Sequence, residues 1–291
     1  MSAQGIEAAA PPQGQRVLQP PRWTPVGALT RLWHHRGLIP YFGRRYLERR
    51  YARTLLGWVW IPLRPTFDVG ARVLLFGGFL GVASGDRPYF MFFIIGMAAW
   101  QLFDRTAFWA MRAIEMNRTL LSRVHVSRLS PVVAAIVPGA LDLLLYLGIA
   151  LIGATYYALT HGSSYLVVDR ATAWAGLGIF LLALFAIALG MLLAPLAAEA
   201  RDVRFFSRYV FGFWFFLTPI VYPISTIPPG YRKLAELNPI TAPVELVKYG
   251  LLRTAEPTSL SLTVSLATLC VLLVGGLWFF ARRERAGTER I

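Results

Sequence analysis

The clearest chemistry in this sequence comes from three charged side chains inside long apolar stretches. Asp104 and Arg105 lie within residues 89–111, and Asp142 lies within residues 131–158. A charge inside an apolar membrane helix is costly and usually faces a partner or water. Adjacent helical residues point about 100° apart, so Asp104 and Arg105 cannot neutralise each other face to face. We therefore predict that Arg105 pairs across helices with Asp142.

The sequence contains no motif for an enzymatic centre. A phosphate-binding loop requires Gly-Lys followed by Ser or Thr, with the lysine on the terminal phosphates. The only two lysines, Lys233 and Lys248, follow arginine and valine. The four histidines have no second ligand at metal-binding spacing, and neither GxSxG nor HExxH occurs. We expect no catalytic residue and no metal site, so any ATP-driven step requires a partner chain.

The composition indicates a polytopic membrane protein. Of 291 residues, 56% are hydrophobic and the mean hydropathy is +0.53, whereas soluble domains average roughly 45–50% apolar residues. The net charge of +14 is compatible with nucleic-acid binding or with loops that face anionic lipid. The basic residues alternate with long apolar runs, which favours the lipid-facing interpretation. One cysteine excludes an internal disulfide bond.

The fold class that we predict is all-α, with six membrane-spanning helices. Apolar stretches of about 20 residues fit a bilayer, and they lie at about 64–84, 89–111, 131–158, 173–198, 207–227 and 259–281. In the first, Asp68 and Arg72 are four residues apart and can pair on one face. Residues 63–282 would form one transmembrane domain.

The distribution of arginine predicts the orientation. With the amino terminus in the cytoplasm, 21 of the 29 basic residues fall in cytoplasmic segments, six fall outside and two lie within spans. The positive-inside rule therefore favours two cytoplasmic termini. We expect residues 1–28 to be a disordered cytoplasmic tail, with no signal peptide, and residues 283–291 to be a second tail.

A basic segment precedes the first span. Residues 29–62 combine apolar residues at helical spacing with a cluster of arginines, which is typical of a helix in the membrane interface. The residues that we assign to this interfacial helix are Arg45, Arg49, Arg50, Tyr51 and Arg53.

Residues 112–130, here called the coupling segment, lie between spans two and three. The segment is long enough for a short helix across the cytoplasmic face. It is either a solvated connector or a docking helix for a cytoplasmic partner. The candidate docking residues are Glu115, Asn117, Arg118, Leu121, Arg123 and Val124.

Residues 228–257, here called the external gate, follow a stretch that is apolar but broken by proline. Non-helical backbone at membrane depth is tolerated only where protein buries it or where it lines an aqueous cavity. We therefore predict re-entrant helices that close the outer mouth of a pathway. The residues assigned to this gate are Pro219, Pro223, Pro228, Pro229, Asn238 and Pro239.

These features together resemble the permeases of ABC-2 type transporters. The resemblance rests on Arg201-Asp202 before span five, Thr218-Pro219 and Tyr222-Pro223 at its end, and Leu237-Asn238-Pro239 before a helix. In the amino-terminal half it includes Leu56-Gly57, Trp60 and Pro62, which end the interfacial segment, and it covers nearly the whole chain from about residue 31. Within the family the chain is most similar to exporters of polysaccharides such as O-antigen, capsule, teichoic acid or galactan.

The resemblance implies a machine of several chains in the bacterial inner membrane. Two copies of the permease would work with two cytoplasmic subunits that bind ATP and Mg²⁺. Closure of those subunits would push on the coupling segment and open a path at the permease dimer interface. A lipid-linked glycan would then move outward, and this chain itself would carry no cofactor and bind no nucleic acid.

A path for sugars would use aromatic faces and hydrogen-bonding groups. Aromatic residues in spans two and five can serve this purpose, although Trp and Tyr also favour membrane interfaces and Phe is common towards lipid. The candidate pathway residues are Trp100, Phe103, Asp104, Arg105, Phe108, Trp109, Trp214 and Tyr222.

Other functions remain open at this point. An ion-coupled secondary transporter would favour inverted repeats and several titratable groups at mid-membrane, but we find no convincing repeat. A membrane enzyme or scaffold for lipid-linked sugars would need clustered carboxylates or histidines near one interface. Related permeases export drugs or lipids without glycans, so the resemblance leaves these substrates as alternatives.

Overall fold

The computed structural model describes residues 25–51, 57–82, 84–123 and 126–288, and this part of the chain contains helices and no strand. The α-helices are α1 (Pro25–His34), α2 (Leu38–Tyr51), α3 (Trp60–Arg72), α4 (Tyr89–Met111), α5 (Ala113–Met116), α6 (Arg118–Arg123), α7 (Leu129–Ala134), α8 (Ile136–His161), α9 (Thr172–Glu199), α10 (Arg201–Leu217), α11 (Pro229–Glu236), α12 (Thr241–Leu252) and α13 (Ser259–Thr288). A 3₁₀ turn, η1 (Gly57–Val59), precedes α3, a π-helical segment, η2 (Val73–Phe79), continues it, and a second 3₁₀ turn, η3 (Ile224–Thr226), follows α10.

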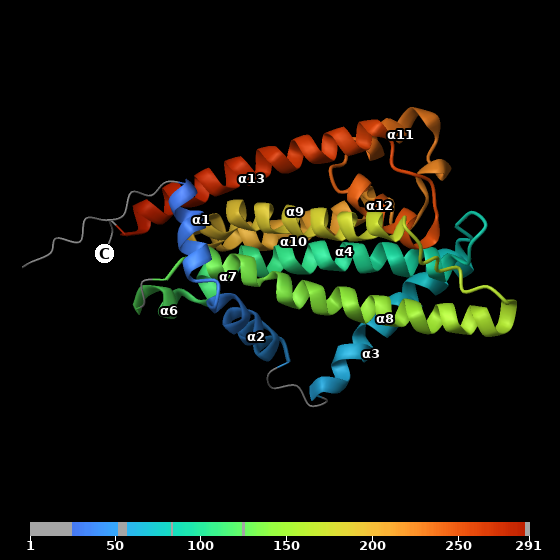
Figure 1. Cartoon of the computed structure of the whole chain (residues 1–291), viewed down its shortest axis with the longest axis horizontal. Helices are drawn as coiled ribbons and strands as arrows, with labels where there is room; N and C mark the ends of the chain where they lie inside the picture. The colour runs from blue at the N-terminus through green and yellow to red at the C-terminus, as the bar shows by residue number, and fades with distance from the viewer. Residues whose placement is uncertain (1–24, 52–56, 83, 124–125, 289–291) are drawn as a thin grey trace, which may run out of the picture.

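Helices α4 and α9 form the centre of the bundle (Figure 1). Helix α4 packs against α8 and α9, while α9 also contacts α12 and α13. Residues of α4 are buried almost continuously from Met91 to Met111. A helix that is apolar all round is typical of a buried or membrane-embedded element. Helix α9 fits this pattern, and α4 fits it except at Gln101, Asp104 and Arg105.

Glycine lets the helices approach closely at two crossings. A Cβ atom on Gly139 of α8 would lie 2.1 Å from Thr106 Oγ1 and 2.9 Å from the Leu102 carbonyl oxygen of α4. A Cβ atom on Gly178 of α9 would lie 2.6 Å from the Pro243 carbonyl oxygen of α12. Small residues at helix crossings are typical of membrane bundles, where close backbone packing replaces hydrophobic attraction.

Three helical stretches are long and apolar enough to span a membrane. They are Leu129–His161, Thr172–Glu199 and Ser259–Arg283 among the described residues. They correspond to the third, fourth and sixth expected spans. The predicted bounds of the second span agree with α4, Tyr89–Met111. The six-span topology as a whole stays a prediction.

Helix α10 is shorter than the fifth expected span. Pro219 lacks a backbone N–H and forces the preceding residue out of the α-helical region. Thr218 accordingly has extended φ and ψ angles of −92° and 137°, and α10 ends at Leu217. Its 17 residues cover about 26 Å, less than the roughly 30 Å of a bilayer core. The expected range of 207–227 is therefore helical only in its first half.

The first expected span also differs from its prediction, because α3 begins at Trp60 and its continuation η2 ends at Phe79, before residue 84. The interfacial segment forms two helices, α1 and α2, and α1 begins at Pro25, inside the expected tail. Residues 1–24 lie outside the described residues.

The two ends of the bundle carry different elements (Figure 1). Helices α1 and α6 and the carboxy-terminal end of α13 lie at one end, which we call the coupling end. Helix α11 and the loops around it lie at the opposite end, which we call the gate end. The coupling segment and the external gate are thus separated by the length of the bundle.

The Gly139 crossing leads to a stability prediction. Gly139→Ala should destabilise the protein by about 1–3 kcal/mol, because overpacking forces α4 and α8 apart. Gly148→Ala on the same helix is the matched control, since a Cβ atom there meets nothing within 4 Å. Thermal unfolding in one detergent should give a lower Tm for the first variant only. Equal Tm values would show that the crossing is not tightly packed.

Candidate functional site

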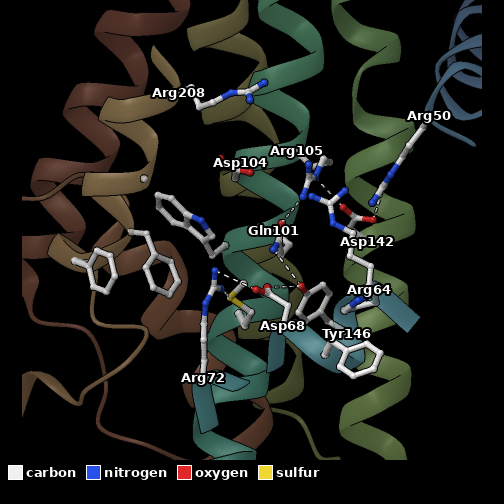
Figure 2. Close-up of a pocket in the computed structure, with 17 residues that line it drawn as sticks. Arg50, Arg64, Asp68, Arg72, Gln101, Asp104, Arg105, Asp142, Tyr146 and Arg208 are labelled. Atoms are coloured by element: carbon white, nitrogen blue, oxygen red, sulfur yellow. Dashed lines mark hydrogen bonds and ion pairs between the residues drawn. The ribbon is translucent and has the colours of Figure 1, made fainter. Parts of the chain in front are cut away.

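A polar cavity of about 640 Å³ lies inside the bundle. Its walls come from α2, α3, α4, α8 and α10 (Figure 2). The lining residues are Arg50, Arg64, Pro65, Phe67, Asp68, Arg72, Met97, Trp100, Gln101, Asp104, Arg105, Asp142, Tyr146, Arg208, Gly212, Phe215 and Phe216. Five arginines and three aspartates line the cavity, so it has an excess of positive charge when all are ionised.

Asp142 of α8 is the centre of the charged network. One of its carboxylate oxygens lies 2.6 Å from Arg50 Nη1 and the other lies 2.9 Å from Arg105 Nε. The Asp142 side chain is 3% exposed, so this charge depends on its two partners. The predicted pair of Arg105 and Asp142 is confirmed, and Figure 2 shows Arg50 reaching the same carboxylate from α2.

Hydrogen bonds continue from Arg105 along the wall of the cavity. Arg105 donates to Gln101 Oε1 at 3.3 Å, and Gln101 Nε2 donates to the Tyr146 hydroxyl at 3.1 Å. The Tyr146 hydroxyl donates to Asp68 Oδ2 at 3.1 Å, and Asp68 pairs with Arg72 at 3.1 Å. The predicted pair of Asp68 and Arg72 is thus confirmed. This series of polar contacts joins α4, α8 and α3.

Two arginines of the cavity have no carboxylate within 4 Å among the described residues. They are Arg64 at the start of α3 and Arg208 in α10, and both side chains are exposed. The Arg208 guanidinium lies 5.5 Å from the ring centroid of Phe108, within the range of a cation–π contact. These two residues can therefore bind an anion that enters the cavity.

The structure divides the eight predicted pathway residues. Trp100, Asp104 and Arg105 line the cavity, and the remaining five, which are Phe103, Phe108, Trp109, Trp214 and Tyr222, do not. Phe103 and Trp214 pack edge to face inside the bundle, with centroids 5.4 Å apart. The Trp109 ring packs on Tyr46, and the Tyr222 hydroxyl donates to the Phe216 carbonyl. Four of the five therefore make packing or hydrogen-bond contacts within the bundle, and their place in a pathway stays a prediction.

The sequence analysis missed most of the lining, although its spacing carries a signal. Arg64, Asp68 and Arg72 are spaced by four residues, so they share one face of α3. Asp142 and Tyr146 have the same spacing on α8. A search for polar residues at this spacing inside apolar helices would have added Arg64 and Tyr146 to Asp68, Arg72 and Asp142, which the sequence had already indicated.

The coupling segment consists of α5, α6 and the start of α7. Glu115 forms an ion pair with Arg204 of α10, and Asn117 is buried, where its Nδ2 donates to the Tyr46 hydroxyl of α2 at 3.2 Å. These two contacts point into the protein. Among the other predicted docking residues, Arg118 and Arg123 are exposed, Leu121 is half-buried and Val124 lies outside the described residues.

Helix α2 holds the predicted interfacial arginines. Arg45 is half-buried, the Arg49 guanidinium donates to the Met116 carbonyl at 2.8 Å, and Arg50 enters the cavity. For Tyr51 the structure describes the backbone alone, and Arg53 lies outside the described residues. Burial raises the pKa of the Tyr46 hydroxyl, so this group stays protonated and can donate.

Side chains at the gate end satisfy the backbone where α10 breaks. Asn238 Nδ2 donates to the Leu217 carbonyl at 3.3 Å and to Thr218 Oγ1 at 3.0 Å. Its Oδ1 accepts from Trp214 Nε1 at 2.8 Å and from the Ile240 N–H at 3.1 Å. One buried amide thereby replaces the partners that a continued helix would have supplied.

A buried lysine completes this arrangement. Lys248 of α12 is 2% exposed, and its Nζ donates to the Pro219 carbonyl at 2.5 Å and the Ile220 carbonyl at 3.4 Å. The Tyr89 hydroxyl donates to the next carbonyl, that of Val221, at 2.9 Å. The broken backbone is therefore held by side chains from α4 and α12.

The other gate residues have structural positions that fit their chemistry. Pro223 precedes η3, and Pro228 and Pro229 stand at the amino-terminal end of α11, where a missing N–H costs nothing. The Pro239 carbonyl accepts a hydrogen bond from Ser265 Oγ at 2.6 Å. Whether these residues open during a cycle stays a prediction.

No group of three or more His, Cys, Asp or Glu side chains suited to a metal ion occurs in the described part of the chain. The charged cavity instead offers arginine donors, which recognise phosphate and carboxylate groups.

Comparisons with known proteins agree with the resemblance that was found in the sequence. The model of the ABC-2 type transporter family matches residues 42–252. The chain is 28% identical over 216 residues to the O-antigen export system permease protein RfbA of Myxococcus xanthus, covering 72% of this chain and 78% of that protein. It is 21% identical over 250 residues to the polysialic acid transport protein KpsM of Escherichia coli, covering 83% of this chain and 92% of that protein.

The Asp142 network predicts that two aspartates in one cavity differ in their contribution to the stability of the protein. Asp142→Asn should destabilise the protein by about 3–5 kcal/mol, because it leaves Arg50 and Arg105 without their shared counter-charge. Asp104→Asn is the control, since Asp104 lies in the same cavity and forms no ion pair with the described residues. Thermal unfolding in detergent compares them. A Tm of Asp142→Asn equal to that of Asp104→Asn would contradict the role of the network.

The gate end gives a second prediction, and the two lysines make a matched pair. Lys248→Met removes the donor to two carbonyls, so hydrogen exchange of the peptide that covers residues 216–223 should accelerate about tenfold. Lys233→Met changes an exposed lysine on α11 and should leave this peptide unchanged. The same exchange rates in both variants would show that Lys248 does not hold the break.

Proposed function

Because the chain belongs to the ABC-2 type transporter family, we propose that it is the transmembrane subunit of an ATP-driven exporter of a lipid-linked polysaccharide. The family model covers most of the chain, which also confirms the recognition from sequence. The two relatives are named for O-antigen export and polysialic acid transport, and these names support a saccharide polymer as cargo.

The cavity is the observation that carries this proposal. A lipid-linked glycan presents phosphate near its lipid and sugar rings beyond it. Arg64 and Arg208, which have no carboxylate partner among the described residues, supply guanidinium groups for an anionic group. Trp100 and Phe215 offer aromatic faces on the same walls, against which the apolar faces of sugar rings can slide.

Energy would come from another chain. The sequence has no Gly-Lys-Ser/Thr motif, so ATP and Mg²⁺ would bind to two cytoplasmic subunits rather than to this protein. The exposed residues of α6, Arg118 and Arg123, are available to such a partner. In this topology both termini would be cytoplasmic and the protein would lie in the bacterial inner membrane.

A second copy would complete the pathway. Helices α3 and α10 contribute Phe67 and Phe216 to the lining of the cavity, and both side chains are largely exposed. Further apolar residues on α10, including Phe206 and Phe213, are exposed as well. Such a surface suits contact with lipid or with another permease, and pairing through it would enclose the cavity.

Two alternatives differ in what they predict. An ABC-2 exporter of a drug or of a lipid without a glycan would share the partner subunits but not the polymer. An ion-coupled secondary transporter would need neither. Removal of the gene from its native host should abolish surface polysaccharide only if the protein exports a lipid-linked polysaccharide.

The test combines this deletion with variants of the cavity. The double variant Arg64→Gln and Arg208→Gln should lower surface polysaccharide by about tenfold, because the anion loses two charged donors. Arg44→Gln, an exposed arginine of α2 that pairs with Glu48 on its own helix, should export normally. Normal surface polysaccharide in the deletion strain would contradict the proposed cargo, and membrane levels of each variant must match.

A further inference from the structure

The coupling segment contacts two helices, and each carries an arginine of the cavity one turn beyond the contact. On α2 the contact residue is Tyr46 and the cavity residue is Arg50; on α10 they are Arg204 and Arg208. We propose that Arg50, anchored by Asp142, is a positioning residue. Through it, a displacement of the coupling segment changes the spacing of the charged groups in the cavity. The inference rests on the proposed exporter function and concerns how that site is regulated.

The first contact joins the coupling segment to α2. Asn117 is 1% exposed, and its Nδ2 donates to the Tyr46 hydroxyl at 3.2 Å. The Tyr46 hydroxyl donates in turn to the Pro131 carbonyl at 2.9 Å. Arg49 adds a bond of 2.8 Å to the Met116 carbonyl. Two of these contacts hold the segment to one turn of α2, and the bond to Pro131 ties the same turn to α7.

Helix α2 can carry a displacement because it is packed along its length. A Cβ atom on Gly43 would lie 2.5 Å from Val137 Cγ2 of α8, so the two helices touch closely there. Phe42, one turn before Tyr46, is fully buried. Tyr46 and Arg50 are four residues apart and share a helical face. A shift at Tyr46 therefore moves Arg50 unless the helix unwinds.

Asp142 converts this movement into a change in the cavity. Its two oxygens hold Arg50 and Arg105, which belong to α2 and α4. Separating either pair would break a charge-assisted contact in a buried network, which is energetically costly. When α2 moves, Asp142 and Arg105 must follow or exchange partners. The hydrogen bond from Arg105 to Gln101 extends this dependence along the wall.

The second contact acts on the opposite wall. Glu115 of the coupling segment forms an ion pair with Arg204 near the start of α10. Arg208 lies one turn further along the same helix and lines the cavity. A movement of the coupling segment would therefore shift Arg50 and Arg208 together. The spacing of positive charge around a bound anion would then depend on the state of the ATP-binding partner.

The first experiment uses the permease alone, so it does not depend on the proposed cargo. Hydrogen exchange is measured for the peptide that covers residues 113–121 in wild type, Arg50→Met, Arg50→Lys and Arg44→Met. Arg50 pairs with Asp142 of α8, outside this peptide, and Arg50→Met should accelerate the exchange of the peptide about tenfold. Arg50→Lys should have a smaller effect and Arg44→Met none. Unchanged exchange in Arg50→Met would overturn the proposal.

The second experiment uses the assembled exporter in vesicles that contain the host's lipid-linked polymer. Arg50→Met should lower the amount of polymer exported per ATP hydrolysed by about tenfold, and Arg50→Lys should restore part of it. If Arg50→Met raises the KM for polymer but leaves the amount of polymer exported per ATP unchanged, Arg50 only binds cargo. That result would overturn the positioning role. If wild-type vesicles show no ATP-dependent export, the proposed exporter function is contradicted. The hydrogen-exchange result would still decide whether Arg50 is linked to the coupling segment.

Discussion

The structure depends on one constraint, which is that polar groups inside an apolar bundle must find partners within the protein. A charge or a broken backbone that faces lipid has no water to replace a lost hydrogen bond. Asp142 meets this requirement with two arginines from two other helices. The positions of α2, α4 and α8 are therefore linked by the same carboxylate that shapes the cavity. Packing by glycine at the α4–α8 crossing brings the two helices close enough for the network to form.

The same constraint explains the gate end. Proline ends α10 within the bundle and leaves carbonyl groups without helical donors. Asn238 and Lys248 reach these groups from the external gate, so the break is stable only while that gate is in place. The external gate and the fifth span are thus one structural unit. The charged cavity and the gate lie on the same bundle, so a pathway between them would need to disturb both sets of bonds.

The sequence predicted the features that depend on local pattern. It located α4, the pair of Asp68 and Arg72 on one helix and the proline break after α10. It also predicted the pair of Arg105 and Asp142, because few charges were available in the spans. The burial of Phe103 and Trp109 could not be inferred, since rotation about a helix that is apolar all round is decided by its neighbours.

The role of Arg50 shows a second limit of the sequence. The cluster of arginines on α2 is typical of a helix that faces lipid head groups. The long side chain of Arg50 can equally turn inward. Only the approach of α2 to α8 places it on Asp142. Asn117 was expected to face a partner and instead is buried against Tyr46, because a polar residue in a short connector can serve either purpose.

The central claim is that this chain is the membrane subunit of an ATP-driven exporter. It is tested most directly by purifying tagged protein from its native host in mild detergent, with mass spectrometry and an ATPase assay of the eluate. The account predicts a stoichiometric ATP-binding subunit and ATPase activity that is lost when the α6 surface at Arg118 and Arg123 is reversed in charge. A stable assembly of this chain alone, without ATPase activity, would contradict it and favour an ion-coupled transporter.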